Sequence, residues 1–253
     1  MITVSGASAK LRAGWQPVDR DALATAAGAV QRHAALHLLL AGALFLGAFE
    51  LSPALLTELR DRLLPQDATL VYLSPAEYML LRFRLAGYAA ICGLALTAGI
   101  DAWVALRSRL AAGSPGVARV TVVLLMALAL FVAGIAYAQL LMLPLVLEYL
   151  HSDAAAAGFA STYSLSAFYS FVLLLTVSLG IAFELPLAVL LLLRLELATV
   201  AQLAHYRRHI AVGFFVLAAF ITPPDVISQF LLAVPLLLLF ELSLLAGRVS
   251  GKP

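Results

Sequence analysis

Charge is scarce in this sequence. Only 12% of its 253 residues are charged, whereas 63% are hydrophobic, and the mean hydropathy is +1.01. These values exclude a soluble domain, and several long apolar runs indicate a helical membrane protein. We expect one integrated bundle rather than a series of domains, and the net charge of +2 gives no reason to expect nucleic acid as a partner.

Cysteine is nearly absent. The one cysteine, Cys92, lies in an apolar run, so no disulfide can form within the chain. The sequence has no Gly-rich phosphate loop of the type G-x-x-x-x-G-K-S/T, so we expect no ATP hydrolysis by the chain itself. The serines of the apolar runs have no obvious base beside them, which argues against an intramembrane protease. The chain is therefore predicted not to be an enzyme.

Two histidine pairs have the spacing of metal ligands on a helix. His33 and His37 are four residues apart, and so are His205 and His209, which can place each pair on one helix face. Neither pair has an acidic or cysteine ligand beside it in the sequence, and no H-E-x-x-H motif occurs. We predict no metal site and no other cofactor.

Six apolar segments are long enough to be membrane helices or nearly so. Lysine and arginine concentrate in cytoplasmic loops, and here twelve of them fall on one side of these segments. Only Arg60 and Arg62 fall on the other side, while Arg82 and Arg84 lie just inside the second segment and are expected to reach toward the interface. Both termini are therefore predicted to be cytoplasmic. The segments are about 34–51, 79–106, 120–147, 167–193, 210–221 and 226–240.

The regions outside the spans divide the chain into three parts. Residues 1–32 form a cytoplasmic N-terminal segment without the apolar core of a cleavable signal peptide. Residues 33–248 form a single six-helix membrane domain, and 249–253 a cytoplasmic tail. In the longest outer loop, residues 54–64 have apolar residues at helical spacing with charges between them, which predicts a helix along the membrane surface.

The last two apolar segments are separated only by T-P-P-D at 222–225. The prolines cannot continue the first helix, but they suit the first turn of the next one. Thr222, followed three residues later by Asp225, fits a capping box with Thr222 as the N-cap. We expect a tight hairpin whose first helix has about a dozen apolar residues, fewer than the roughly 20 that span a bilayer. Gln229 and Pro235 interrupt the apolar pattern of the second helix.

These residues carry a resemblance to a known family. T-P-P-D-x-x-S-Q, followed by L-A-x-P and F-E, resembles the C-terminal signature of the TatC family, the polytopic subunit of the twin-arginine protein translocase. F-E-L-P at 183–186 and Y-R-R at 206–208 fit the same family in the same order. The resemblance is dense from 163 to 248. It implies an all-α polytopic membrane protein with six transmembrane helices, N-in/C-in, with short fifth and sixth helices in a tight hairpin and a concave bundle.

The resemblance also implies a function. A TatC-like protein is a non-enzymatic receptor and scaffold in the cytoplasmic (inner) membrane. It would recognise the twin-arginine signal peptides of folded precursors, work with TatA- and TatB-like single-span subunits in the lipid bilayer, and form homo- and hetero-oligomers. The energy source that the family implies is the proton gradient.

The first half of the chain departs from the family pattern. The family usually shows H-L-x-E-L-R-x-R-L before its first span, whereas the similar T-E-L-R-D-R-L at 57–63 follows an apolar span and is interpreted as a coincidence on the outer side. The family's Q-x-W is replaced by D-A-W at 101–103, and the loop at 110–119 has no glutamate. In the family, glutamates at these two cytoplasmic places contact the paired arginines, because carboxylates bind guanidinium bidentately. Either Asp19, Asp21, Asp101 or Glu196 substitutes, or the site that reads the signal has been lost.

Several polar residues are candidates for contact with signal peptides or partner helices. Glu184 lies deep in an apolar span, where a carboxylate is functional by default, although a protonated acid bonded to a neighbouring helix is the alternative. Gln229 corresponds to a family polar cluster that contacts the helix of TatB or TatA, although it could simply tie two helices together. Glu241 is expected at the interface or paired with a basic neighbour. The candidate residues are Glu184, Gln229, Asp101, Pro186, Asp225 and Arg207.

Two other functions stay open. A TatC-like accessory subunit that binds partners without reading the twin-arginine motif is favoured by the missing glutamates. A proton-coupled secondary transporter would use Glu184 and Asp101, but such proteins often show internal repeats, and the two halves of this chain show none.

Overall fold

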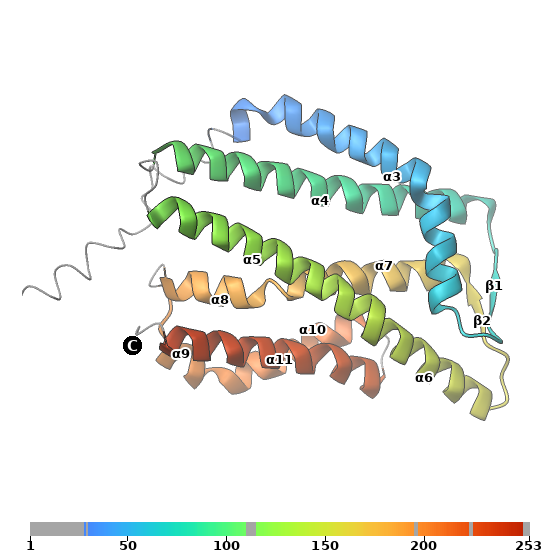
Figure 1. The fold of residues 1–253 in the computed structure, drawn as a ribbon. Helices are drawn as coiled ribbons and strands as arrows, with labels where there is room; N and C mark the ends of the chain where they lie inside the picture. Colours follow the sequence, from blue (N-terminus) through green and yellow to red (C-terminus); the bar gives the residue numbers. More distant parts are fainter. Residues whose placement is uncertain (1–27, 29, 110–114, 195–196, 223–224, 250–253) are drawn as a thin grey trace, which may run out of the picture.

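Long apolar runs fold as helices in a bilayer because no water is present to satisfy backbone groups. The computed structural model describes residues 28, 30–109, 115–194, 197–222 and 225–249. Its long helices lie side by side and alternate in direction (Figure 1). The elements are α3 Ala34–Leu63, β1 Thr69–Val71, α4 Pro75–Arg109, α5 Pro115–Tyr137, η1 Ala138–Met142, α6 Leu143–Ala156, β2 Thr162–Ser164, α7 Leu165–Ala182, α8 Leu185–Arg194, α9 Val200–His205, α10 Arg207–Ile221 and α11 Val226–Val249.

In the part of the chain that the structure describes, five helical segments are long and apolar enough to cross a membrane. They cover all or most of the first, second, third, fourth and sixth predicted spans, which are thereby confirmed as long apolar helices. The fifth predicted span is α10, whose 15 residues correspond to about 22 Å, less than the ~30 Å hydrocarbon core. Its shortness was predicted. Its partner α11 continues past the predicted end at 240 to Val249, because the apolar pattern runs on to Arg248 in the last turn.

The third span is longer than the sequence predicted. It continues without interruption from α5 through η1 into α6 and ends at Ala156 rather than near 147. The segment η1 is a π-helical turn, in which the backbone holds one extra residue. Such turns occur frequently at functional sites in membrane and soluble proteins. Pro144 lies two residues after η1, and because the helix is continuous here, its missing N–H leaves a gap in the ladder of helical hydrogen bonds beside the π-helical turn.

The predicted outer helix at 54–64 is present, but it is the second half of α3. Figure 1 shows α3 bending so that its last turns run across the neighbouring helices. Pro53 lies inside the helix and is the cause of the bend. The apolar side chains of this half, Leu56, Leu59 and Leu63, are buried in the protein core. Its apolar face therefore packs on the bundle and not on lipid.

The main core gathers where the second half of α3 meets α6, α7 and α11. Val146, Val172, Leu179 and Leu236 are fully or almost fully buried there. Most other large apolar side chains are exposed on the outside of the bundle, as expected for a protein whose solvent is lipid. A smaller cluster joins α8, α9 and the end of α11.

Two short strands connect loops at one end of the bundle. β1 pairs with β2 in parallel, with Thr69 opposite Thr162 and Val71 opposite Ser164. This pairing ties the loop after α3 to the loop after α6. The sequence did not predict it, because three-residue strands carry no periodic signal.

Candidate functional site

Glu184 lies at a break in the fourth span. α7 ends at Ala182 and α8 begins at Leu185, so Phe183 and Glu184 form a turn within a continuous apolar segment. Pro186 explains the break, because it has no N–H to continue the ladder of helical hydrogen bonds. The Glu184 carboxyl is half-buried, and among the described residues it forms no hydrogen bond or ion pair. A carboxyl without a partner among the described residues is thus held at a helix break within an apolar segment.

Three helices meet beside this break. The Tyr137 ring on α5 lies 5.6 Å from the Phe183 ring, centroid to centroid. The Tyr137 hydroxyl donates a 2.9 Å hydrogen bond to the Leu231 carbonyl on α11. Leu231 is four residues before Pro235, so this carbonyl has no helical N–H partner. Tyr137 replaces that partner and fixes α11 against the broken span.

A second polar pair lies at the π-helical turn. Gln139 donates through Nε2 to the Thr176 hydroxyl at 2.6 Å, and Thr176 in turn donates to the Val172 carbonyl at 2.7 Å. The Gln139 Oε1 atom is buried and has no hydrogen-bond partner in the described part of the chain. Neither Gln139 nor Tyr137 was predicted as a site residue, although each is a polar group within the third apolar run.

The hairpin of α10 and α11 holds Gln229. Gln229 Nε2 donates a 2.9 Å hydrogen bond to the Phe215 carbonyl, so the side chain does tie the two helices together. Its Oε1 atom has no partner among the described residues. Gln229 is also the polar residue in the lining of a pocket of about 390 Å³, with Val212, Phe215, Val216, Ala219 and Phe220. The side chain is therefore both a tie and the one polar group of an apolar groove.

The turn of the hairpin is capped differently from the prediction. The Asp225 carboxylate accepts a 2.7 Å hydrogen bond from the Ser228 backbone N–H and a very short one from the Ser228 hydroxyl, so Asp225 caps α11. Thr222 instead ends α10, and its hydroxyl donates to the Ala218 carbonyl at 2.9 Å. The predicted capping box with Thr222 as N-cap is wrong. The helix begins at Val226, which gives Asp225 the N-cap position. Pro223 and Pro224 lie outside the described residues.

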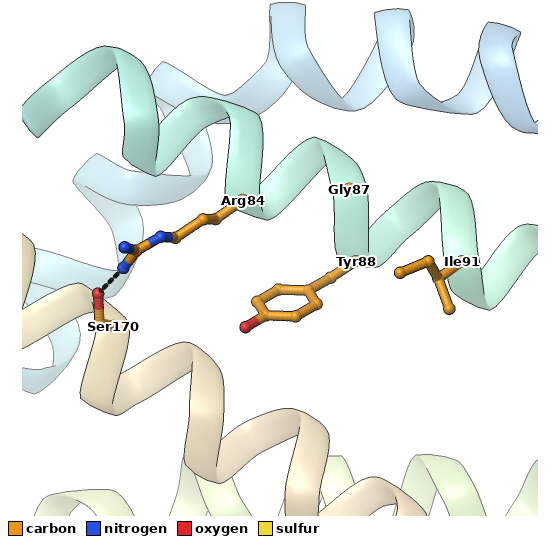
Figure 2. A pocket seen from close by; sticks show the side chains of 5 residues that line it. All are labelled: Arg84, Gly87, Tyr88, Ile91 and Ser170. Carbon is orange, nitrogen blue, oxygen red and sulfur yellow. Dashed lines mark hydrogen bonds between the residues drawn. The ribbon is translucent and has the colours of Figure 1, made fainter. Parts of the chain in front are cut away.

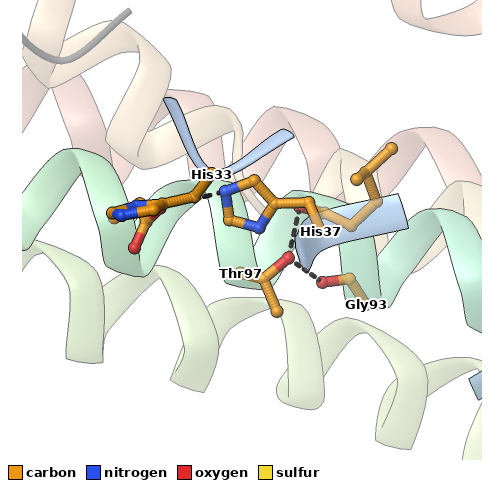
Figure 3. A network of polar contacts seen from close by, with 6 residues as sticks. His33, His37, Gly93 and Thr97 are labelled. Atoms are coloured by element: carbon orange, nitrogen blue, oxygen red, sulfur yellow. Dashed lines mark hydrogen bonds and ion pairs between the residues drawn. The ribbon is translucent and has the colours of Figure 1, made fainter. Parts of the chain in front are cut away.

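Asp101 on α4 contacts His33, the residue before α3, and His37, which lies in the first turn of α3. Figure 3 shows the two histidines beside Thr97 of α4. The Asp101 Oδ2 atom lies 2.6 Å from His33 Nδ1 and 3.0 Å from His37 Nε2. The His37 contact has the distance of an ion pair but not the alignment of a hydrogen bond. His37 is buried and the Asp101 side chain is 23% exposed. The acidic partner that the histidines lack in the sequence is thus supplied by α4, although no cluster suited to a metal ion is found among the described residues.

Arg207 and Glu241 form an ion pair between α10 and α11. Arg207 Nη2 lies 3.0 Å from Glu241 Oε2, and both side chains are about half exposed. Of the two alternatives predicted for Glu241, an interfacial position or a basic partner, the ion pair confirms the second. Asp19 and Asp21, which were considered as substitutes for the missing glutamates, lie outside the described residues, as does Glu196.

The six predicted site residues fall in separate places rather than one. Glu184 and Pro186 share the helix break, Asp225 and Gln229 share the hairpin, and Arg207 pairs at the base of α10. Asp101 lies on α4 and contacts the start of α3. Among the described residues, no hydrogen bond or ion pair joins one of these groups to another, so a ligand that touched all of them would have to be extended.

Comparison with known proteins assigns the fold and the family. The family model described as Sec-independent protein translocase protein (TatC) matches residues 25–235. The TatC protein of Haemophilus influenzae is 40% identical over 119 residues, which is 47% of this chain and 46% of that protein. The TatCd protein of Bacillus subtilis is 33% identical over 178 residues, 70% of this chain and 72% of that protein. For most of the curated relatives, the matched part spans about half of the relative's length or less.

A solved structure supports the same assignment. The crystal structure of the twin-arginine translocase receptor TatC superposes with a TM-score of 0.73 at 26% identity, covering 88% of this chain and 98% of that one. The same receptor in a second crystal structure gives a TM-score of 0.69 at 29% identity. The family match covers most of the chain, and the arrangement of helices is the same. The chain is a multi-pass membrane protein that belongs to the TatC family of Sec-independent protein translocase proteins.

Proposed function

We propose that this chain is the multi-pass subunit of a twin-arginine translocase, acting in signal-peptide recognition and as a scaffold for the export of folded proteins. Family membership supports the proposal, and one observation carries it. Glu184 is a half-buried carboxyl at a helix break inside an apolar span, with no partner among the described residues. Such a group is costly to place in a membrane and is characteristic of a binding site.

The separate positions of the polar groups suggest how the parts are used. An extended signal peptide would enter at the end of the bundle where Asp101 lies and run along it past Glu184. The apolar groove beside Gln229 suits the side of a single transmembrane helix, such as that of a TatA- or TatB-like subunit. The free Gln229 Oε1 can accept a hydrogen bond from that helix, and the short α10 would thin the bilayer around the groove by hydrophobic mismatch.

The proposal includes a location and an orientation. The protein resides in the cytoplasmic membrane with both termini cytoplasmic, as the distribution of lysine and arginine favours. Residues 1–32 and 249–253 then lie in the cytoplasm, and 33–248 form the six-helix membrane domain. In the proposed assembly, the chain forms oligomers with copies of itself and with single-span subunits. Nucleic acid is not a partner.

The test is export of a folded reporter with a twin-arginine signal in cells that lack their own TatC. The chain is supplied with its single-span partners. We expect export by the unchanged protein and a loss of at least about tenfold in the variant Glu184→Gln, because the amide cannot carry the carboxylate's charge. Glu148→Gln, which removes an exposed carboxylate from the middle of α6, is the matched control and should export normally. Normal export by Glu184→Gln, with equal protein in the membrane, would contradict the assignment.

One observation favours a second candidate, an accessory subunit that binds partners but does not read the arginines. Asp101, the carboxylate nearest to the family's reading position, is already engaged by two histidines. A reporter with two lysines in place of the arginines separates the candidates. Export that depends on the arginines supports the receptor, whereas a protein that co-purifies with its partners but ignores the arginines is the accessory subunit.

A further inference from the structure

Arg84 lies on the surface of α4, and none of the described carboxylates forms an ion pair with it. Its Nη1 atom donates a 2.5 Å hydrogen bond to the Ser170 hydroxyl on α7 (Figure 2). In the described part of the chain, no carboxylate lies within ion-pair distance of it. By contrast, Arg60 pairs with Asp61, and Arg207 pairs with Glu241. The guanidinium of Arg84 therefore has most of its donors available to an anion from outside the chain.

A cavity of about 310 Å³ opens beside this guanidinium. It is lined by Arg84, Gly87, Tyr88 and Ile91 of α4 and by Ser170 of α7. Figure 2 shows the Tyr88 ring extending from α4 into the space toward α7, on the same side as Arg84. The Tyr88 hydroxyl has no hydrogen-bond partner among the described residues. The cavity thus presents one cation and two hydroxyls above an apolar wall.

Gly87 keeps the cavity open. A Cβ atom built at this position would have no heavy atom within 4 Å, so the space in front of the backbone is empty. Ile91, one turn deeper, is 65% exposed and faces the surroundings of the bundle. The polar end of the cavity is therefore continuous with an apolar outer surface.

The depth of Arg84 indicates which anions can reach it. Arg84 and Asp101 are 17 residues apart on one helix, or about 25 Å along its axis. The hydrocarbon core of a bilayer is roughly 30 Å thick. If Asp101 lies near one interface, Arg84 lies near the other, at the level of lipid phosphate and glycerol groups. Tyr88 one turn deeper occupies the position of the aromatic belt.

We propose that Arg84, Tyr88 and Ser170 bind the phosphate of an anionic phospholipid at the membrane interface opposite Asp101. The guanidinium supplies a charge-assisted hydrogen bond and the hydroxyls supply neutral ones. The acyl chains lie along Gly87 and Ile91 between α4 and α7. Because the cavity carries a positive charge that no carboxylate of the described chain balances, a lipid with net negative charge is bound in preference to a zwitterionic one.

The experiment is native mass spectrometry of the purified full-length protein with added phosphatidylglycerol or phosphatidylethanolamine. We expect phosphatidylglycerol to bind more tightly than phosphatidylethanolamine, and Arg84→Gln to weaken the phosphatidylglycerol affinity about tenfold. Arg62→Gln removes one exposed charge near the same end of the bundle and should leave the affinity unchanged. Equal binding of both lipids by the unchanged protein would overturn the proposal.

A second variant keeps the test decisive if Arg84→Gln folds poorly. Gly87→Leu places a side chain in the cavity of about 310 Å³, where its Cβ atom would meet no heavy atom within 4 Å, and it replaces glycine with a better helix former. We expect it to keep the fold, as judged by gel filtration and circular dichroism, and to lose phosphatidylglycerol binding. Unchanged lipid binding in Gly87→Leu contradicts the site. A second result would also contradict the site. If Arg84→Gln binds lipid as before but co-purifies less of a single-span partner, the cavity belongs to a partner helix.

Discussion

Two prolines inside long helices each leave a carbonyl without its helical partner, and a side chain from another helix takes its place. Pro53 frees the Phe49 carbonyl, which accepts hydrogen bonds from Ser52 Oγ at 2.6 Å and from Arg82 Nη2 at 2.8 Å. Pro235 frees the Leu231 carbonyl, which accepts from Tyr137 at 2.9 Å. In a bilayer no water could serve either carbonyl, so these residues stabilise the bends.

At the residue scale, Tyr137→Phe tests the second of these contacts. The change removes one hydroxyl and leaves the Leu231 carbonyl unpaired, so we expect the free energy of unfolding to fall by about 1 kcal/mol. Reversible unfolding in mixed micelles measures it. Tyr163→Phe is the control, because the Tyr163 hydroxyl has no partner in the described part of the chain. A loss of equal size in both variants would show that the hydrogen bond to Leu231 is not the cause.

Arg82 has a larger predicted effect. It bonds both the Phe49 carbonyl and Ser52 Oγ, and its guanidinium lies 3.9 Å from the centroid of the Phe49 ring. The sequence predicted only that Arg82 reaches toward the interface. We expect Arg82→Leu to lower the free energy of unfolding by about 2 kcal/mol, as for hydrogen bonds to charged groups.

A double-mutant cycle isolates the cause of the Arg82 effect. Pro53→Ala restores a backbone N–H that can bond the Phe49 carbonyl within α3, so Arg82→Leu should cost less in that background. The same unfolding measurement applies to all four proteins. An Arg82→Leu penalty that is identical with and without Pro53 would contradict a role for Arg82 in satisfying the bend.

At the element scale, α5 and α7 approach closely at two glycines. A Cβ atom at Gly134 would meet the Leu179 carbonyl oxygen and, at 2.9 Å, the Gly180 Cα atom. Small residues permit such backbone contact between membrane helices. Since the third and fourth spans carry Tyr137 and Glu184, this contact sets the geometry around the helix break.

Gly134→Val is predicted to force α5 and α7 apart. We expect a loss of about 2 kcal/mol or more, because the new side chain would meet backbone atoms that cannot move aside. Gly99→Val is the control with the same chemistry, since a Cβ at Gly99 meets nothing within 4 Å. Melting temperatures in one detergent compare the two, and equal stability of both variants would rule out a close contact at Gly134.

At the scale of the whole molecule, the start of α3 and the end of α11 lie at one end of the bundle (Figure 1). Arg32, Arg208 and Arg248 belong to the elements at this end, which the positive-inside rule assigns to the cytoplasm. The loops joined by β1 and β2 lie at the other end.

Thiol labelling tests this orientation. In a Cys92→Ser background, a cysteine at Ser152 near the end of α6 should react with a membrane-impermeant maleimide in intact cells. A cysteine at Arg208 should react only after permeabilisation. Cys92→Ser alone shows the background. The reverse pattern would mean that both termini lie outside.

The class of protein, the positions of the long helices, the short α10 and the family all follow from the sequence alone. Apolar length is a local property, and a bilayer requires every spanning segment to satisfy its own backbone, so hydropathy predicts helices directly. The hairpin motif and F-E-L-P were enough to indicate the TatC family, which the comparisons confirm.

Which polar groups meet depends on how the helices pack, and the sequence does not predict that. Asp101 contacts His33 across 68 positions of sequence, and Tyr137 contacts Leu231 across 94. In a soluble helix the polar face marks the side that is not buried, but here the lipid-facing and the protein-facing sides are both apolar. The sequence therefore gave no signal for helix rotation. The cap at Asp225 depends on where α11 starts, and the partners of Arg82 depend on how α3 and α4 approach each other. Packing between the helices determines both.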